Sequence, residues 1–138
     1  MKLWKLDFKK DTLTMKHTKT LQLKEAVLSV EFTKDGKFIA VALMDSTVKV
    51  FYRDTLKFWN SLYGHHLPVN CLAASDDSTL MVTGSADRAV KLWGMDFADC
   101  HKSFIAHDKG GEFKVTILNT KSNLRKINFQ NFFGSIAR

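Results

Sequence analysis

The sequence predicts an all-β chain built from four-stranded units, and three observations predict this fold class. Residues 27–66 lie over residues 69–108 without a gap, so that Val27 matches Val69 and Asp45 matches Asp87 at one constant offset. In both copies, short runs rich in valine, isoleucine, leucine and aromatic residues alternate with turn residues. Helical periodicity is absent from residues 27–106. Four short strands in each copy of a repeat of this length are typical of a β-propeller blade.

Each copy is expected to hold four strands joined by tight turns. The expected strands of the two copies are 27–33, 37–43, 47–52 and 56–63, then 69–75, 79–85, 89–94 and 100–106. Aspartate recurs in the turns, and its side chain tolerates the conformations that tight turns need. These turn aspartates are Asp35, Asp45, Asp77 and Asp87.

The repeat starts earlier than its first complete copy and stops after the second. Residues 1–8 align with the third strand of each copy, and residues 15–23 are expected to form a fourth strand after a charged loop. Trp4, Phe51 and Trp93 fall at matching positions and are expected in the core. The expected organisation is two strands of a preceding blade in 1–23, a degenerate blade in 24–66, a well-formed blade in 67–108 and a divergent basic tail in 109–138. Such a chain is expected to be a fragment that is marginally stable alone.

The second copy carries a recognisable repeat signature. Its landmarks are Gly64-His65 before the first strand, Gly84-Ser85-Ala86-Asp87 after the second, and Val90-Lys91-Leu92-Trp93 in the third. The pattern resembles the WD-repeat family, with Gly94 standing where a final aspartate is usual. The resemblance implies a partial WD-repeat β-propeller.

The same resemblance implies a buried structural tetrad of His65, Ser85, Asp87 and Trp93. In it the aspartate accepts from the imidazole, the serine hydroxyl relays, and the indole N–H finds an acceptor. The first copy has Leu23, Leu43, Asp45 and Phe51 at these positions, so it is expected to rely on apolar packing.

Three stretches, at 51–58, 62–69 and 86–103, go beyond the general signature and resemble WD-repeat proteins of the small-subunit processome. This resemblance implies a non-catalytic scaffold in the nucleus and nucleolus. Its implied partners are other processome proteins and the U-three small nucleolar ribonucleoprotein, and its implied role is pre-18S rRNA processing. A general WD-repeat adaptor in another pathway is the alternative. Candidate surface positions are Lys34, Lys37, Arg53, His66 and Arg88.

Basic charge is concentrated in the tail. The chain has 21 Lys+Arg and 14 Asp+Glu, a net charge of +7, yet residues 1–108 carry little of this excess. Lys121, Arg125 and Lys126 lie among phenylalanines and resemble a small RNA-contacting arm, with cations for phosphates and rings for stacking. The competing interpretation is that the tail after Asp108 is not propeller sequence.

No cofactor, metal, small-molecule substrate or catalytic residue is expected. His65, His66 and Cys71 lack the spacing of a zinc site, as do Cys100, His101 and His107. Ser85, Asp87 and His65 match a hydrolase triad in residue type, but Ser85 precedes a β-turn rather than a nucleophile elbow.

The remaining signals concern the compartment. Two cysteines without paired spacing form no disulfide framework and fit a reducing compartment. No apolar run approaches the roughly 20 residues that span a bilayer, and the N-terminus does not resemble a signal peptide. The chain is therefore expected to be soluble, intracellular and without a membrane partner.

Overall fold

A computed structural model describes residues 1–106 with their side chains, and the backbone of residues 113–119 and 125–131. These residues form twelve β-strands. They contain no helix, so no helix in the described part of the chain could cross a membrane. The all-β fold class predicted from the sequence is confirmed.

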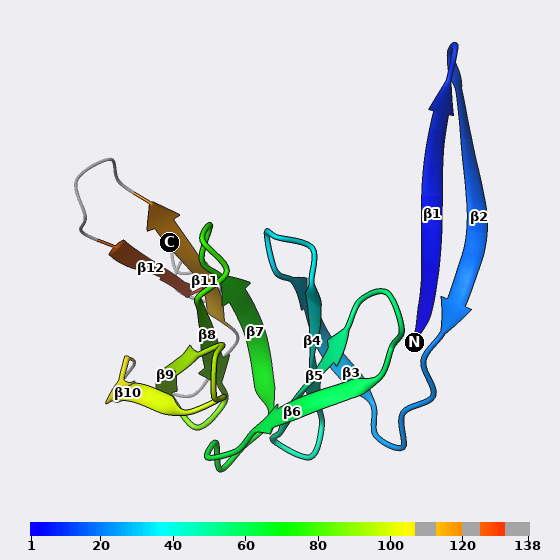
Figure 1. The fold of residues 1–138 in the computed structure, drawn as a ribbon. Helices are drawn as coiled ribbons and strands as arrows, with labels where there is room; N and C mark the ends of the chain where they lie inside the picture. The colour runs from blue at the N-terminus through cyan, green and yellow to red at the C-terminus, as the bar shows by residue number, and fades with distance from the viewer. Residues whose placement is uncertain (107–112, 120–124, 132–138) are drawn as a thin grey trace, which may run out of the picture.

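Two four-stranded antiparallel sheets form the body of the molecule (Figure 1). In each sheet the strands lie side by side in chain order. We call the first sheet the first blade; its strands are β3 (Val27–Phe32), β4 (Phe38–Leu43), β5 (Val48–Tyr52) and β6 (Phe58–Leu62). The second sheet is the second blade; its strands are β7 (Val69–Ala74), β8 (Leu80–Ser85), β9 (Ala89–Gly94) and β10 (Cys100–Ile105).

Two hairpins flank the blades. In the first, β1 (Lys2–Lys9) pairs with β2 (Thr12–Thr20) and stands as a long arm beside the first blade (Figure 1). Lys10 and Asp11 both have positive φ, at 29° and 64°, so the chain reverses at once. The second of these strands therefore begins before the expected residue 15. In the other hairpin, β11 (Phe113–Asn119) pairs with β12 (Arg125–Asn131), within the stretch expected to be a divergent tail.

Alternate residues of the central strands point into different apolar layers. On β4, Phe38, Ala40 and Ala42 face the second blade, while Ile39 and its alternate neighbours face the base of the arm. Both faces of β4 are covered, which explains its unbroken apolar sequence. The expectation that Phe51 and Trp93 lie in the core is met, but Trp4 is 51% exposed. Trp4 belongs to the arm, whose apolar face has no covering layer among the described residues.

One apolar cluster joins the two blades. It contains residues of both sheets and of the turn after β9: Phe38, Ala40, Ala42, Val48, Val50, Leu62, Val69, Leu72, Ala74, Met81, Trp93 and Met95. Two hydrogen bonds also cross between the blades. The Asp35 amide donates to Ser78 Oγ at 2.9 Å, and the Ala74 amide donates to Glu31 Oε1 at 3.5 Å. The blades are therefore held together by a shared core and by backbone-to-side-chain contacts.

Candidate functional site

The turn between the first two strands is built in the same way in both blades. In the first blade, the Thr33 hydroxyl donates to Asp35 Oδ1 at 2.6 Å. In the second, the Ser75 hydroxyl donates to Asp77 Oδ1 at 2.6 Å. Each carboxylate also accepts the backbone N–H two residues further on, which closes a local turn. The turn aspartates thus satisfy backbone donors in both blades.

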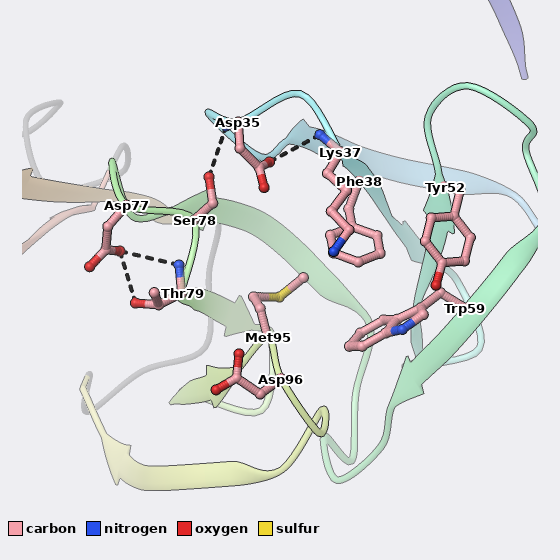
Figure 2. A pocket seen from close by; sticks show the side chains of 10 residues that line it. All are labelled: Asp35, Lys37, Phe38, Tyr52, Trp59, Asp77, Ser78, Thr79, Met95 and Asp96. Atoms are coloured by element: carbon pink, nitrogen blue, oxygen red, sulfur yellow. Dashed lines mark hydrogen bonds between the residues drawn. The ribbon is translucent and has the colours of Figure 1, made fainter.

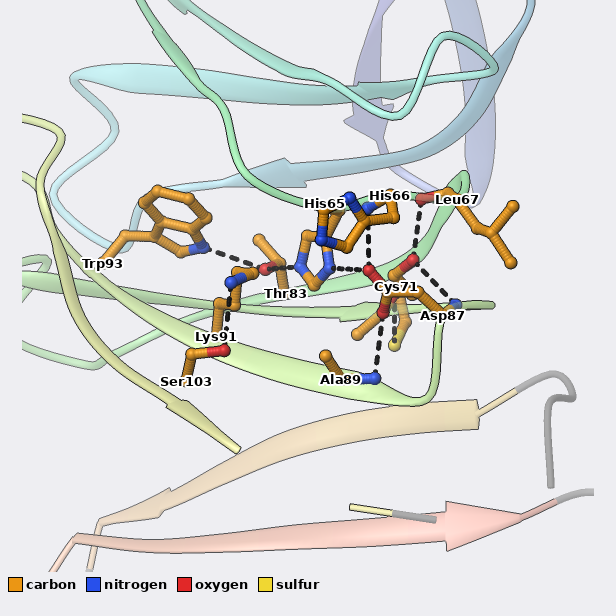
Figure 3. Close-up of polar contacts among 12 residues, drawn as sticks. His65, His66, Leu67, Cys71, Thr83, Asp87, Ala89, Lys91, Trp93 and Ser103 are labelled. Carbon is orange, nitrogen blue, oxygen red and sulfur yellow. Dashed lines mark hydrogen bonds and ion pairs between the residues drawn. The ribbon is translucent and has the colours of Figure 1, made fainter. Parts of the chain in front are cut away.

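A chain of buried hydrogen bonds distinguishes the second blade (Figure 3). The His65 imidazole lies 3.0 Å from Asp87 Oδ2 through Nδ1 and 2.7 Å from Thr83 Oγ1 through Nε2. The Trp93 indole N–H donates to the same Thr83 oxygen at 2.9 Å. These four side chains therefore form one connected network that runs from the loop before β7, across β8, to β9.

The electrostatics of the network assign its protons. Burial lowers the pKa of His65, and this effect outweighs the attraction of the Asp87 carboxylate, so the imidazole is neutral at pH 7. Because a carboxylate can only accept, the single imidazole proton belongs on Nδ1, facing Asp87. Nε2 then accepts the Thr83 hydroxyl proton, and the Thr83 oxygen accepts from Trp93. In this network the imidazole, the Thr83 hydroxyl and the indole N–H each have a hydrogen-bond partner.

Asp87 stays ionised although its side chain is largely buried. Burial alone would raise the pKa of Asp87, but hydrogen bonds from the amides of His66 and Ala89 and from the His65 imidazole lower it below its ordinary value. Those amides donate at 2.9 Å each. The carboxylate therefore fixes the turn between β8 and β9 and the loop that carries His65 at the same time.

The sequence interpretation was wrong about the relaying hydroxyl. Ser85 does not lie between the imidazole and the indole; its hydroxyl donates to the Leu67 carbonyl at 2.7 Å and accepts the Asp87 amide at 3.2 Å. Thr83 takes the relaying position. Ser85 instead supports the loop and the turn that position His65 and Asp87.

Strand register explains why the relay is Thr83. Met81 on β8 pairs directly with Trp93 on β9. Alternate residues of a strand share a face, so Thr83 is the diagonal neighbour of Trp93 on that face. Ser85 lies two residues further along β8, beyond the reach of the indole N–H. Strand alternation combined with the pairing of β8 and β9 is the signal in the sequence that could have found Thr83.

Gly94 lies beneath two side chains of the neighbouring turn and strand. A Cβ added to Gly94 would lie 2.9 Å from Asp99 Oδ1 and would also overlap the imidazole of His101. These two side chains, from the turn before β10 and from β10 itself, lie 3.5 Å apart over the glycine. Both are half-exposed side chains, so a larger residue at position 94 would require Asp99 and His101 to move outward.

The network resembles a catalytic triad in its connections, but a substrate cannot reach it. Thr83 is 0% exposed, and its hydroxyl oxygen already accepts from Trp93. In residues 1–106 no group of three or more histidine, cysteine or acidic side chains could hold a metal ion. Cys71 is buried, Cys100 is exposed, and neither is in a disulfide. The arrangement fits a structural role better than a chemical one.

The other predicted sites lie on the surface or outside the described side chains. Lys34, Lys37, Arg53, His66 and Arg88 are all exposed. Lys121 falls outside the described residues. Arg125 and Lys126 begin β12, and the description of that strand is limited to its backbone. The proposed RNA arm therefore stays a prediction.

Comparison with known proteins places the chain in a family. A family model described as the WDR3 second beta-propeller domain matches residues 1–124. The match continues past Asp108, where the sequence repeat ends. Among solved structures, the chain is similar to the crystal structure of RRP9 WD40 repeats, with a TM-score of 0.62 and 16% identity, over 68% of this chain and 30% of that one. At such low identity this likeness supports the fold alone.

Curated relatives match parts of the chain more closely. Human WD repeat-containing protein 3 is 54% identical over 75 residues, which are 50% of this chain and 8% of the human protein. Its Dictyostelium discoideum homolog is 58% identical over 64 residues, 46% of this chain and 7% of the homolog. The Saccharomyces cerevisiae U3 small nucleolar RNA-associated protein 12 is 47% identical over 57 residues, 41% of this chain and 6% of the yeast protein. The matched segments are less than a tenth of each relative's length.

Proposed function

The chain belongs to the WDR3 second beta-propeller domain family, and from this premise we propose that it is part of a WD-repeat scaffold for assembling the small ribosomal subunit. The scaffold acts in the nucleolus with the U-three ribonucleoprotein and other processome proteins, and it supports pre-18S rRNA processing. The observation that carries this proposal is the family match over residues 1–124. The name of the yeast relative, which refers to the same small nucleolar RNA, supports it.

The structure supports a binding role rather than catalysis. The two blades share a packed core, and their turns are fixed by internal hydrogen bonds, so the loops stand on a firm base. Surfaces of this kind serve protein recognition, because loops held on a rigid scaffold present side chains with little loss of conformational entropy. The buried histidine network contributes by holding the loop before β7.

Co-purification tests the proposal. The chain carries an affinity tag in cells of its own source, and co-purified RNA and proteins are measured against an unrelated tagged protein. We expect enrichment of the U-three RNA over other small nuclear RNAs, together with proteins of the small-subunit precursor. Recovery of a different assembly, without that RNA, would support the general adaptor instead.

Deletion of residues 109–138 separates the scaffold from RNA binding by the tail. If protein partners recruit the chain, the U-three RNA stays enriched when the deletion variant is purified. If the basic tail reads the RNA, enrichment is lost, while binding of protein partners in nuclease-treated extracts persists. Circular dichroism of the deletion variant confirms that its strands still form.

A further inference from the structure

A cavity of about 400 Å³ opens between the two blades (Figure 2). It lies beside the turns that carry Asp35 and Asp77, and it reaches to β5, β6 and the turn after β9. This cavity is separate from the histidine network and lies where the Asp35–Ser78 hydrogen bond and the shared core meet the surface.

Aromatic rings form one wall of the cavity. Phe38 and Trp59 have ring centroids 4.8 Å apart, and Phe38 and Tyr52 have theirs 5.2 Å apart. Phe38 is 7% exposed and anchors the group, whereas Tyr52 is 37% exposed and Trp59 is half-buried. Such rings offer apolar surface to an alkyl chain and an electron-rich face to a cation.

The opposite wall is acidic, although the chain as a whole is basic. Asp35, Asp77 and Asp96 line the cavity with a single cation, Lys37, so the lining carries a net charge of −2 in a chain of +7. Asp35 is ionised at neutral pH, and a hydrogen bond from the Thr33 hydroxyl is the main cause that lowers its pKa further. The three carboxylates of the lining favour a cation over the phosphates of a nucleic acid, although the Arg53 guanidinium lies close by, against Gly36.

The resident cation shows how an ammonium group fits here. The Nζ atom of Lys37 lies 5.1 Å from the centroid of the Phe38 ring, against the aromatic wall (Figure 2). Lys37 itself is exposed, and its charge acts on the neighbouring Asp35 carboxylate without a close ion pair among the described residues. It can therefore turn out into solvent and leave the wall open.

We propose that this inter-blade cavity binds a lysine side chain from an extended segment of a partner protein. The alkyl stem packs on Trp59 and Tyr52, and the ammonium group lies between the aromatic wall and the carboxylates. Lys37 occupies the place until the partner's lysine replaces it. The inference deepens the scaffold role proposed above by naming the chemistry of one contact, and it rests on that role for the existence of a protein partner.

A peptide titration followed by NMR tests the proposal directly. The probe is the capped peptide Ala-Ala-Lys-Ala-Ala, compared with the same peptide carrying Nε-acetyl-lysine. The reporter is the indole N–H signal of Trp59, assigned from its loss in Trp59→Phe. We expect a saturable shift with the lysine peptide and a much weaker one with the acetylated peptide, which lacks the charge.

Matched variants locate the contact. Asp96→Asn should weaken binding roughly fivefold, since one exposed carboxylate partner is lost. Asp76→Asn is the control: this exposed residue precedes Asp77 in the same turn but does not line the cavity, so affinity should change less than about twofold at moderate salt. Lys37→Met should tighten binding roughly threefold, because the competing cation is removed.

Four results would overturn the proposal: equal binding of both peptides, equal effects of Asp76→Asn and Asp96→Asn, no tightening in Lys37→Met, or a response of Trp59 to single-stranded RNA but not to the peptide. Urea unfolding of each variant shows that it is folded. The peptide assay uses purified chain, whereas the scaffold role is judged by co-purification, so either can fail alone. Loss of peptide binding with retained U-three RNA would reject only the cavity.

Discussion

The two blades have the same strands and turns, yet different kinds of side chain occupy three matching interior positions of the repeat. In the second blade, His65, Thr83 and Trp93 form a hydrogen-bonded network. The first blade has Leu23, Val41 and Phe51 at the matching positions of the repeat, and these three pack together in an apolar cluster. A blade of this shape can therefore be completed either by satisfied polar groups or by apolar contacts alone.

The backbone repeats more closely than the side chains do. Ser46 and Arg88 occupy matching turn positions and have φ angles of 68° and 70°, and the matched Gly36 and Ser78 have φ angles of 69° and 58°. In all four turns the preceding aspartate accepts the amide two residues beyond it. The shared aspartates hold the turns, and this frees the interior to vary between blades.

Removal of the Thr83 hydroxyl, which joins His65 to Trp93, should have the largest effect on stability. Thr83→Val places the first blade's residue in the second blade and leaves His65 Nε2 and the Trp93 indole N–H without a partner. We expect a loss of about 3 kcal/mol in the free energy of unfolding, because two buried polar groups become unsatisfied. Urea unfolding of the purified chain measures it.

Thr83→Ser is the control, since it keeps the hydroxyl and should cost about 1 kcal/mol or less. The triple variant His65→Leu, Thr83→Val, Trp93→Phe copies the first blade's residues and should recover most of the loss, because no unpaired group remains among the three. Equal losses in Thr83→Val and Thr83→Ser would contradict the view that hydrogen bonding sets the network's contribution.

Acid should destabilise the chain through the hydrogen-bonded network of the second blade. The folded pKa of His65 lies below its ordinary value of 6.5, so the unfolded chain takes up the proton first as pH falls. The neutral imidazole therefore contributes its whole stabilisation above pH 6.5, the ordinary histidine value. This contribution declines as the pH falls from there towards the folded pKa of His65. The lowered pKa of Asp87 adds a second loss below its ordinary value of 3.8.

Urea unfolding measured at a series of pH values from about 7.5 down to about 5 tests this prediction. This range extends to both sides of the ordinary histidine pKa. His65→Leu should have a flatter profile in this window than the unaltered chain. His66→Asn is the matched control, because only the backbone of His66 hydrogen-bonds to the network and its side-chain charge has the smallest of the influences that shift the pKa of His65. If the free energy of unfolding of His65→Leu depended on pH as steeply as that of the unaltered chain, another group would be responsible for the pH dependence.

The smallest expected effect concerns the first blade's turn. Ser46 adopts a left-handed conformation, with φ of 68°, that glycine takes without a steric penalty. Ser46→Gly should therefore stabilise the chain by about 0.5 kcal/mol, after the greater freedom of glycine in the unfolded chain is subtracted. Thr47→Gly, which also removes a hydroxyl bonded to Asp45, should destabilise it. Thermal unfolding compares the two; destabilisation by Ser46→Gly would show that the serine side chain is needed there.

Most of the fold could be predicted because its signals are local. Apolar runs mark the strands, and each turn aspartate bonds to an amide two residues away, so sequence spacing alone locates the turns of both blades. The observed strands β4 and β8 start one residue later than expected and end where expected, at Leu43 and Ser85.

The relay needed information that sequence spacing does not contain. Thr83 and Ser85 are both hydroxyl residues on one face of β8, and only the pairing of Met81 with Trp93 decides between them. The length of the arm was missed for a related reason. The turn at Lys10 and Asp11 depends on two positive φ angles, and the sequence there reads as a charged loop.

The two hydrogen bonds that cross between the blades run in opposite directions. The first blade gives an amide at Asp35 to the second blade's Ser78, and the second gives an amide at Ala74 to the first blade's Glu31. Both bonds join residues one repeat and one position apart in the chain. If either blade unravels, a backbone donor of its neighbour loses its acceptor. The unit of cooperative unfolding is then the pair of blades, joined by a nearest-neighbour coupling free energy.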